Sequence, residues 1–281
     1  MKQLIFLFVA AVLLSGCCPQ APKMEENKME QSLIKEGDAI AQINLTVAEG
    51  KRLIAEGIAN DKEVKSRLKS GMVIITRGTT NTYIAERIGG LNAPRGSFMT
   101  GHIIPAETPA INVESVDNIV LIDGVPVEMA YEEALQKMAP GDIIFKGGNL
   151  LNYNKGKVAV NIGAQDGGTT ARLRPYVGEG KAQLIVPIGL EKDGSWDLDM
   201  LEKAYEGRSP LPRLWVHKDA RIFTEIEALK ALSGVEAYPI ASGGIAGREG
   251  GVTLVVVGAK DQVENALRVV ADIRGEKSFI E

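Results

Sequence analysis

Two short segments of the chain share an order of residue types that suits the binding of a small anion. Gly78-Thr79-Thr80-Asn81 and Gly167-Gly168-Thr169-Thr170 each place glycine before two threonines, at the expected start of a helix. Glycine lets the backbone approach a ligand, amides at a helix start attract an anion, and threonine hydroxyls add donors. These loops therefore predict a phosphate or carboxylate site. The alternative is that threonine caps each helix and glycine only makes the turn.

Lys146 and Asp123 are the charged candidates for catalysis. Each follows a short apolar run and precedes a glycine. An amine at a strand end can bind an anion or stabilise an enediolate, and a carboxylate there can act as a general base or orient a hydroxyl. The alternatives are a solvated lysine at a strand end and an ordinary Asp-Gly turn.

Other features narrow the chemistry. Neither glycine-threonine loop ends in Gly-Lys-Ser/Thr and neither reads Gly-x-Gly-x-x-Gly, so neither is a P-loop or a dinucleotide-binding motif. We expect no cofactor. The chain has two histidines, and its two cysteines are the adjacent pair Cys17 and Cys18, which excludes a disulfide framework and a His/Cys zinc site. His102 is either a loop acid or base or a surface residue. His217 is expected to be structural.

The elements that must position these residues alternate between strands and helices. Runs typical of buried strands cover 72–75, 119–122, 143–145, 158–162 and 184–188, and helical periodicity covers 46–68, 79–88 and 128–138. This order predicts an α/β fold with a largely parallel sheet and crossover helices. Because ligands bind outside the carboxyl ends of parallel strands, we expect both loops, Asp123 and Lys146 to share one cleft.

The pattern changes after residues 209–212, Ser-Pro-Leu-Pro, which are typical of a linker. The order strand, helix, strand, strand, helix over residues 213–281 predicts a C-terminal ferredoxin-like α+β unit. The sequence thus predicts an α/β ligand-binding domain over 38–208 and a ferredoxin-like domain over 213–281. The glycine-rich stretch 242–251 is interpreted as a hairpin loop, or otherwise as a lid.

The N-terminus has the features of an export signal. Lys2 precedes the apolar run Leu4–Leu14, which is shorter than the roughly 20 residues that a membrane-spanning helix needs. Leu14-Ser15-Gly16-Cys17 resembles the lipobox of prokaryotic lipoproteins. This resemblance implies a signal peptide over 1–16, diacylglycerol on Cys17 and an anchor in the membrane lipid outside the cytoplasm. The polar residues 17–37 are expected to form a flexible tether. The alternative is an ordinary secretory signal with a chance cysteine.

Composition excludes several classes of protein. The chain has 281 residues, a formal net charge of −4, 45% hydrophobic and 24% charged residues. These values are typical of globular proteins and exclude a disordered chain, a collagen-like fibre and a polytopic membrane protein. The isoelectric point near 5.5 argues against a nucleic-acid partner, because neutralising phosphates needs clustered lysine and arginine.

The main domain resembles a known superfamily. A strand, Gly-Thr-Thr and a helix, followed by Ile122-Asp123-Gly124 and by Ile144–Gly148, are similar to the ribose-5-phosphate isomerase, glucosamine-phosphate deaminase and CoA-transferase superfamily. The resemblance covers about 71–190 and implies phosphate binding at Thr79-Thr80, with Asp123 and Lys146 near the reacting carbons. The sequence departs from the family where Arg77 replaces a glycine and Val125–Glu128 replaces an acidic run.

The sequence as a whole predicts a membrane-anchored lipoprotein whose α/β domain binds a small phosphorylated or carboxylated metabolite. A divergent sugar-phosphate isomerase-like enzyme is one form of this hypothesis. The alternative is a non-catalytic surface protein that binds a small ligand or a protein partner.

Overall fold

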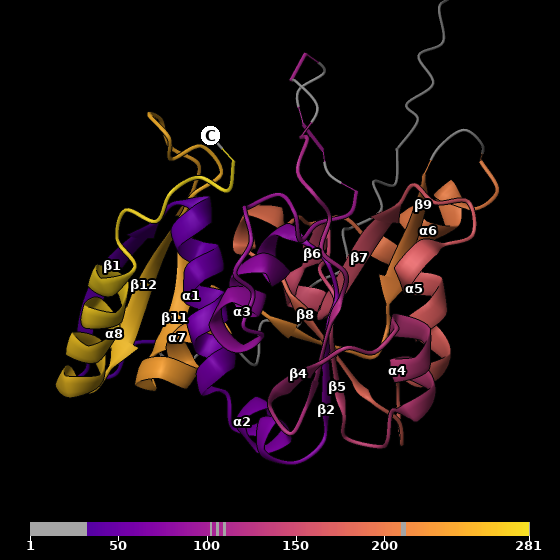
Figure 1. Ribbon diagram of the computed structural model, residues 1–281. Helices are drawn as coiled ribbons and strands as arrows, with labels where there is room; N and C mark the ends of the chain where they lie inside the picture. Colours follow the sequence, from indigo (N-terminus) through magenta and orange to yellow (C-terminus); the bar gives the residue numbers. More distant parts are fainter. Residues whose placement is uncertain (1–32, 102, 105–106, 109–110, 209–211, 281) are drawn as a thin grey trace, which may run out of the picture. The chain divides into compact units, whose positions relative to one another are not determined.

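The computed structural model describes residues 33–101, 103–104, 107–108, 111–208 and 212–280 (Figure 1). Contacts divide the chain at Gly37, and the residues from Gly37 onward form one compact unit. The predicted signal peptide, Cys17 and most of the tether lie outside the described residues, as do His102 and residues 209–211 of the predicted linker.

A mixed six-stranded sheet forms the centre of this unit. Its strands, in spatial order, are β10 (Ala220–Phe223), β8 (Gln183–Pro187), β5 (Ile143–Phe145), β2 (Met72–Ile75), β3 (Ile119–Ile122) and β4 (Val125–Val127). The first four strands are parallel to one another, whereas β3 runs antiparallel to both β2 and β4. The carboxyl end of β3 therefore lies at the edge opposite to the carboxyl ends of the parallel strands.

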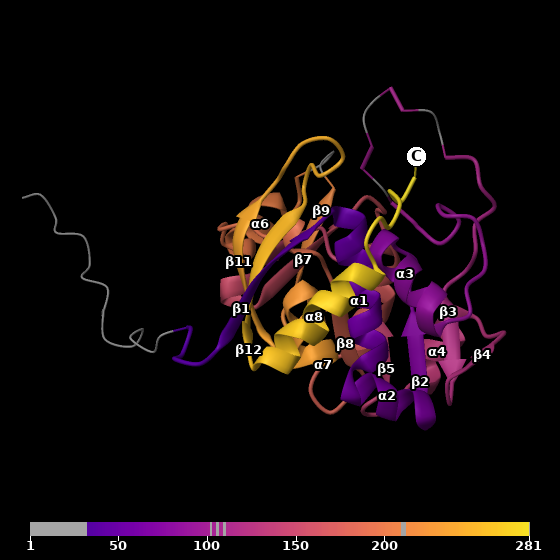
Figure 2. The same cartoon turned by 90° about the vertical axis from the view of Figure 1, so that its left-hand side faces the viewer.

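The central strands are buried on both faces, as their continuous apolar runs predict. Every residue of β2 and β5 is buried. Helix α3 (Thr79–Ile88) and helix α4 (Tyr131–Lys137) lie on opposite sides of these strands (Figures 1 and 2), and α2 (Lys62–Lys69) contacts β2. The core includes the fully buried side chains of Tyr83, Phe98, Phe145 and Phe223.

A second sheet contains β6 (Leu150–Asn152), β7 (Lys157–Ile162) and β9 (Arg213–His217) in that order, with antiparallel pairing. Helix α6 (Leu198–Tyr205) packs on it, and the short helix α5 (Gly168–Leu173) follows β7. The sequence predicted the strand β7 but placed it in the parallel sheet. An apolar run shows that a strand is buried and does not show which strand it pairs with.

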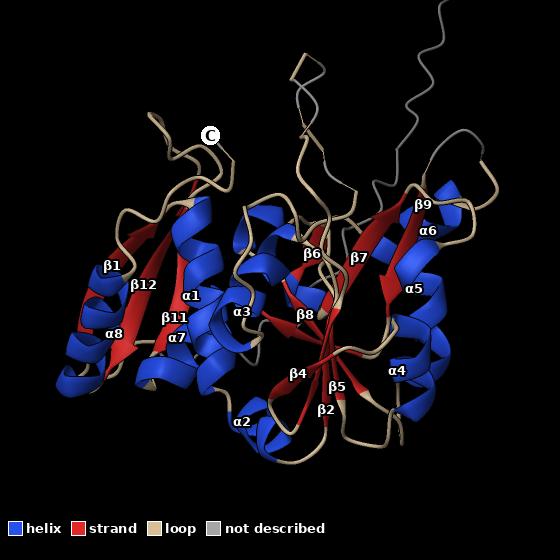
Figure 3. Ribbon diagram, viewed as in Figure 1, coloured by secondary structure: helices blue, strands red, loops and turns tan. Residues whose placement is uncertain are grey.

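The third sheet joins both ends of the unit. Strands β1 (Ala39–Leu45), β12 (Val252–Gly258) and β11 (Glu236–Ser242) lie in that order, and β12 is antiparallel to both neighbours. Helices α1 (Val47–Asn60), α7 (Glu225–Ser233) and α8 (Lys260–Asp272) lie beside it (Figure 3).

This pairing differs from the predicted ferredoxin-like unit over 213–281. Strands β9 and β10, which follow the predicted boundary, pair with β7 and β8 of the preceding region. The partner of β12 is β1, from the start of the unit. The pattern of a single segment cannot reveal a partner that lies so far away in the chain, and the predicted separation into two domains is not confirmed.

Local sequence accounts for where the long helices begin. The Thr46 side chain accepts the Glu49 amide and the Glu49 carboxylate accepts the Thr46 amide, which is a capping box at the start of α1. Thr224 caps α7 and Asp61 caps α2 in comparable ways. None of the helices in the described part of the chain has the length and hydropathy that crossing a bilayer requires.

Candidate functional site

A pocket of about 820 Å³ opens at the carboxyl ends of β2, β5 and β7. We call it the carboxyl-edge pocket. Parallel strands that end side by side commonly place ligand sites at this edge. Its lining includes residues 77–80 after β2, 146–149 after β5, 160–164 and 166–170 around the end of β7, 100, 101, 103, 172, 192 and 212.

Both predicted glycine-threonine loops line this pocket. Gly78 occupies the cap position of α3 and Gly167 that of α5, and neither helix has a side-chain cap hydrogen bond. Gly167 has φ +82°, a left-handed conformation that favours glycine, and a Cβ there would lie 2.7 Å from the Ala171 side chain. The capping alternative is therefore wrong for these threonines, because glycine holds the cap position in each loop. Thr79, Thr80, Thr169 and Thr170 all contribute to the lining.

Asn81 does not line the pocket, although the sequence assigned it to the anion site. It is fully buried, and its Nδ2 donates to the carbonyl oxygens of Thr76 at 2.8 Å and Phe145 at 3.2 Å. These carbonyls lie at the carboxyl ends of β2 and β5. Asn81 therefore holds together the two strand ends that carry the pocket loops. Its Oδ1 has no hydrogen-bond partner among the described residues.

Lys146 extends into the pocket lining directly after β5. The residue is partly exposed, but its amine is desolvated, and burial followed by the nearby charge of Lys192 lowers its pKa to about 8. The sequence suggested a solvated strand-end lysine as the alternative, and this desolvation does not fit that alternative. The following Gly148 allows close packing, since a Cβ there would lie 2.6 Å from Val158.

Asp123 does not share the cleft with Lys146, which corrects the predicted pairing of the two residues. Its carboxylate accepts the Gly71 amide at 2.8 Å, at the start of β2 and so at the opposite edge of the sheet. The cause is the antiparallel direction of β3. Asp123 and Gly124 both have positive φ, 50° and 77°, in the turn between β3 and β4. This is the conformation that two-residue hairpin turns favour for Asp-Gly.

Lys192 is the pocket residue that sequence reasoning missed. It follows β8, whose carboxyl end lies next to that of β5, and its Nζ donates to the Gly148 carbonyl at 3.1 Å. The sequence signal for it was a lysine shortly after the predicted strand 184–188, much as Lys146 directly follows the strand 143–145. The charge of Lys192 contributes to the lowered pKa of both Lys146 and Lys51.

The charge of a buried carboxylate acts on Lys51. Glu225 is 2% exposed, and its Oε2 accepts the Leu190 amide at 2.9 Å. Burial, followed by the charge of Glu191, raises the pKa of Glu225. Both carboxylates act on Lys51, whose pKa is lowered first by burial and then by Lys192.

His217 is a buried histidine close to Lys146. Its side chain belongs to β9, and burial, followed by the charges of Lys146 and Arg174, lowers its pKa to about 4. Its Nε2 has no hydrogen-bond partner within the described residues. The sequence expected a structural histidine, and the structure shows an imidazole that stays neutral at physiological pH.

The other charges of the pocket have partners. Arg172 pairs with Asp166 at 3.1 Å and with Glu132 at 3.4 Å, and Arg77 donates to the Ser115 hydroxyl at 2.7 Å. Across the described ranges, no cluster of three or more histidine, cysteine, aspartate and glutamate side chains is placed to hold a metal ion. Three cations of the pocket lining, Arg77, Lys146 and Lys192, therefore have no ion pair with a carboxylate among the described residues.

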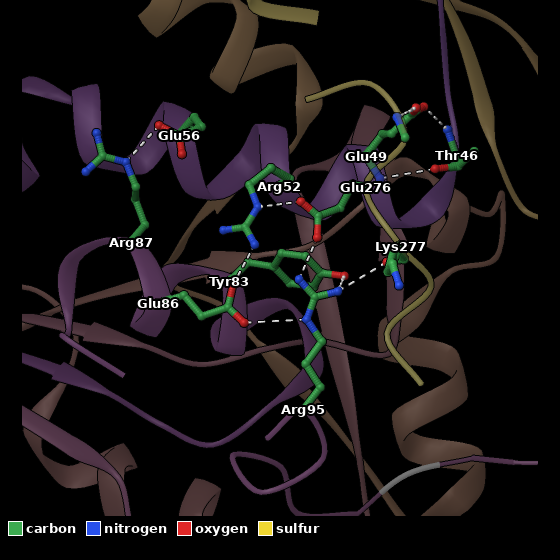
Figure 4. A network of polar contacts seen from close by, with 11 residues as sticks. Thr46, Glu49, Arg52, Glu56, Tyr83, Glu86, Arg87, Arg95, Glu276 and Lys277 are labelled. Atoms are coloured by element: carbon green, nitrogen blue, oxygen red, sulfur yellow. Dashed lines mark hydrogen bonds and ion pairs between the residues drawn. The ribbon is translucent and has the colours of Figure 1, made fainter. Parts of the chain in front are cut away.

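A second charged cluster lies beside α1 and α3 (Figure 4). We call it the Tyr83 cluster, and it consists of Arg52, Tyr83, Glu86, Arg95 and Glu276. A cavity of about 660 Å³ adjoins it, lined by α1, the end of α8 and residues 273–277. Its arginines are already neutralised by carboxylates, so we place the candidate site at the carboxyl-edge pocket.

The fold and site thus define an α/β protein with a mixed central sheet and a cationic pocket at the carboxyl ends of its parallel strands. Compared with protein-family models, curated proteins and solved structures, the chain matches none of them.

Proposed function

We propose that the carboxyl-edge pocket binds a small anionic metabolite that carries a phosphate or a carboxylate. The observation that carries this proposal is the pair Lys146 and Lys192, which act on each other electrostatically in the pocket lining. Among the described residues, no ion pair links either lysine to a carboxylate.

The energetic argument follows from charge burial. A desolvated ammonium is costly unless an opposite charge or hydrogen-bond acceptor compensates it. Here Lys192 donates to one carbonyl, which leaves further N–H donors on its ammonium. The threonine hydroxyls at 79, 80, 169 and 170 supply neutral donors around the same space. An anion would therefore be attracted by two like charges and by hydroxyl donors.

This proposal does not include the isomerase-like pairing of Lys146 with Asp123, since the two lie at opposite edges of the sheet. The alternative of a non-catalytic binding protein stays open beside that of an enzyme. Turnover of a bound ligand distinguishes them.

We also propose that the third sheet is a ferredoxin-like unit made from both ends of the chain. In support, β1 and β11 both run antiparallel to β12 between them, which is the arrangement of a split β-α-β motif. The large α/β region would then be an insertion between α1 and α7.

For location, we propose that the protein is a lipoprotein anchored through diacylglycerol on Cys17 and exposed outside the cytoplasm. The support is the lipobox-like sequence before Cys17. A Cys17→Ser variant should move from the membrane to the soluble fraction, and intact mass should show the lipid on the wild-type protein. A mature chain that begins at another residue contradicts this proposal.

Thermal unfolding with a panel of sugar phosphates, inorganic phosphate and carboxylates tests anion binding. A ligand at a hundredfold excess over its dissociation constant stabilises the protein by about 2.7 kcal/mol. Lys146→Met and Lys192→Met should abolish this ligand-induced shift. The exposed Lys137, paired with Glu133, gives the control Lys137→Met, which should keep it. A shift that survives in both pocket variants would overturn the proposal.

A further inference from the structure

We infer that Lys146 is an amine nucleophile that forms an imine with the carbonyl group of the bound metabolite, so that the ligand is an oxo acid or an oxo phosphate. This inference rests on the proposed anion site and specifies its substrate class. It assigns the two pocket lysines different roles: Lys146 reacts with the carbonyl carbon, and Lys192 holds the anionic group.

The first observation is that no carboxylate in the described ranges of the chain pairs with Lys146. A lysine that pairs with a carboxylate stays protonated and has no lone pair to offer. The charge that acts on Lys146 is that of Lys192, and Lys146 in turn acts on the imidazole of His217; neither neighbour is a carboxylate. A second cation beside a desolvated amine is an arrangement that favours the nucleophilic, uncharged form.

The second observation is the position of Lys146 in the pocket. Lys146 follows the buried strand β5 and lies in the lining of the same pocket as Lys192 and both threonine loops. Lys192 is held by the Gly148 carbonyl, only two residues along the chain from Lys146. Both lysines thus line the one pocket that would hold a small metabolite with a carbonyl and an anionic group.

The chemical step balances without any other reactant. The unprotonated Nζ of Lys146 attacks the carbonyl carbon, a C–N bond forms, and the carbonyl π electrons move to the oxygen, which gains a proton. The resulting carbinolamine loses its hydroxyl group as water and forms the iminium, which loses a proton to give the imine. The sum is amine plus carbonyl to imine plus water, with no change in oxidation state.

The uncharged fraction of the amine makes the reaction selective. With a pKa of about 8 rather than the ordinary 10.5, the unprotonated fraction of Lys146 at neutral pH is about 300-fold that of a surface lysine. Surface lysines such as Lys137 should therefore react far more slowly.

Reductive trapping tests the inference on the purified protein. Pyruvate and dihydroxyacetone phosphate are the carbonyl probes, and lactate and glycerol 3-phosphate are their controls without a carbonyl. Borohydride reduces an iminium to a stable secondary amine, which intact mass and peptide mapping locate. We expect one adduct on Lys146 with at least one carbonyl probe and none with the controls. The Lys146→Arg variant should carry no adduct at position 146, whereas Lys137→Arg should be labelled as the wild type is.

The outcomes separate this inference from the proposed function. If a probe and its control stabilise the protein equally and no adduct forms on Lys146, the pocket binds anions and the imine step is wrong. If no probe or control stabilises or labels the protein, both proposals fail for these ligand classes. If Lys146→Arg does not fold, the distribution of adducts over the lysines of the wild type at pH 7 decides. Labelling of Lys146 must exceed that of any surface lysine at pH 7, and labelling spread evenly over surface lysines overturns the inference.

Discussion

The pocket lysines and the Tyr83 cluster both hold cations away from solvent, but their partners differ. In the Tyr83 cluster, Arg52 meets Glu86 at 2.5 Å and Glu276 at 2.8 Å, while Arg95 meets the same two carboxylates at 3.5 and 2.5 Å. Both guanidinium groups also lie over the Tyr83 ring, 4.7 and 4.5 Å from its centroid.

Two arginines and two glutamates thus neutralise each other. Through its ion pairs with Arg52 of α1 and with Arg95 after α3, Glu276 joins the chain after α8 to this region (Figure 4). In the carboxyl-edge pocket Lys192 acts on Lys146, and no carboxylate of the described part of the chain pairs with either lysine. A balanced cluster stabilises the fold by itself, whereas an unbalanced one is completed only by a ligand. Removing charge should therefore have opposite consequences in the two regions.

The largest expected effect is that of Lys146→Met. At pH 7 the folded protein holds a charged amine whose pKa is lowered from 10.5 to about 8, which corresponds to a cost of about 3 kcal/mol. The uncharged methionine should therefore raise the free energy of unfolding by up to about that amount, while anion binding is lost. Urea denaturation measures the stability, and a decrease in stability would contradict this account of the pocket.

The sign of the pH dependence sharpens this prediction. Between about pH 8 and 10.5 the folded wild type binds fewer protons than the unfolded chain, so its stability rises with pH. The advantage of Lys146→Met should accordingly shrink over this interval. Lys137→Met, at an exposed pair, should show no comparable change.

An effect of similar size is expected on the stability of the protein at acidic pH. The pKa of His217 is lowered from 6.5 to about 4, so the unfolded chain binds the extra proton between these values. Stability from this residue is complete above about pH 6.5 and falls by up to about 3 kcal/mol as the pH approaches 4. Unfolding measured across this window in the wild type and in His217→Gln should give a difference in stability that changes by up to this amount, because the other titrating groups act equally in both proteins.

This acid effect also connects His217 to the pocket. Because the charge of Lys146 helps to lower the pKa of His217, Lys146→Met should raise that pKa and move the acid transition to higher pH. The histidine resonance in NMR titration reports it. An unchanged His217 titration in the variant would show that the two groups do not interact.

The sequence predicted much of the fold because local patterns specify local structure. The runs at 72–75, 119–122 and 143–145 are strands with those bounds, and Thr46 begins a helix, as expected. The direction of β3 could not be predicted, since an apolar run looks the same in a parallel and an antiparallel strand. That single uncertainty accounts for the wrong position of Asp123.

The candidate site was predicted in part for the same reason. Lys146 and both threonine loops follow strands and meet in one pocket, which the position of strand ends predicts. Lys192 could have been found from its place after the predicted strand 184–188. The buried Glu225 and His217 needed tertiary information, because β9 and β10 join their sheets through pairing with distant strands. Burial of an amine is likewise a property of the packed structure and not of its neighbours in sequence.

A smaller effect is expected in the balanced cluster. Glu276→Gln removes the carboxylate that both arginines share, and although burial opposes it, hydrogen bonds from Arg52 and Arg95 lower the pKa of Glu276. The variant should lose about 2 kcal/mol of unfolding free energy at neutral pH, with little change in ligand binding at the pocket. Equal or greater stability of Glu276→Gln would remove the distinction between the two clusters.

The smallest effect separates the ring of Tyr83 from its hydroxyl. The side chain is fully buried, and burial raises its pKa to about 12, so the phenol is neutral throughout the physiological range. Tyr83→Phe keeps the ring under both guanidinium groups and loses only the hydroxyl, which accepts Arg95 at a distance of 3.3 Å. We expect a change within about 0.5 kcal/mol, since the hydrogen bond is long and Arg95 keeps its carboxylates.

Tyr83→Leu provides the matched comparison, because it removes the aromatic face as well. Two cation–π contacts of about 0.5–1 kcal/mol each and part of the buried packing should be lost, for a total of about 2 kcal/mol. Denaturation of both variants at low and high salt separates the contributions, since buried contacts are screened little. If Tyr83→Phe loses as much stability as Tyr83→Leu, then the hydroxyl and not the ring organises the two arginines, and the cluster depends on a hydrogen bond as well as on balanced charge.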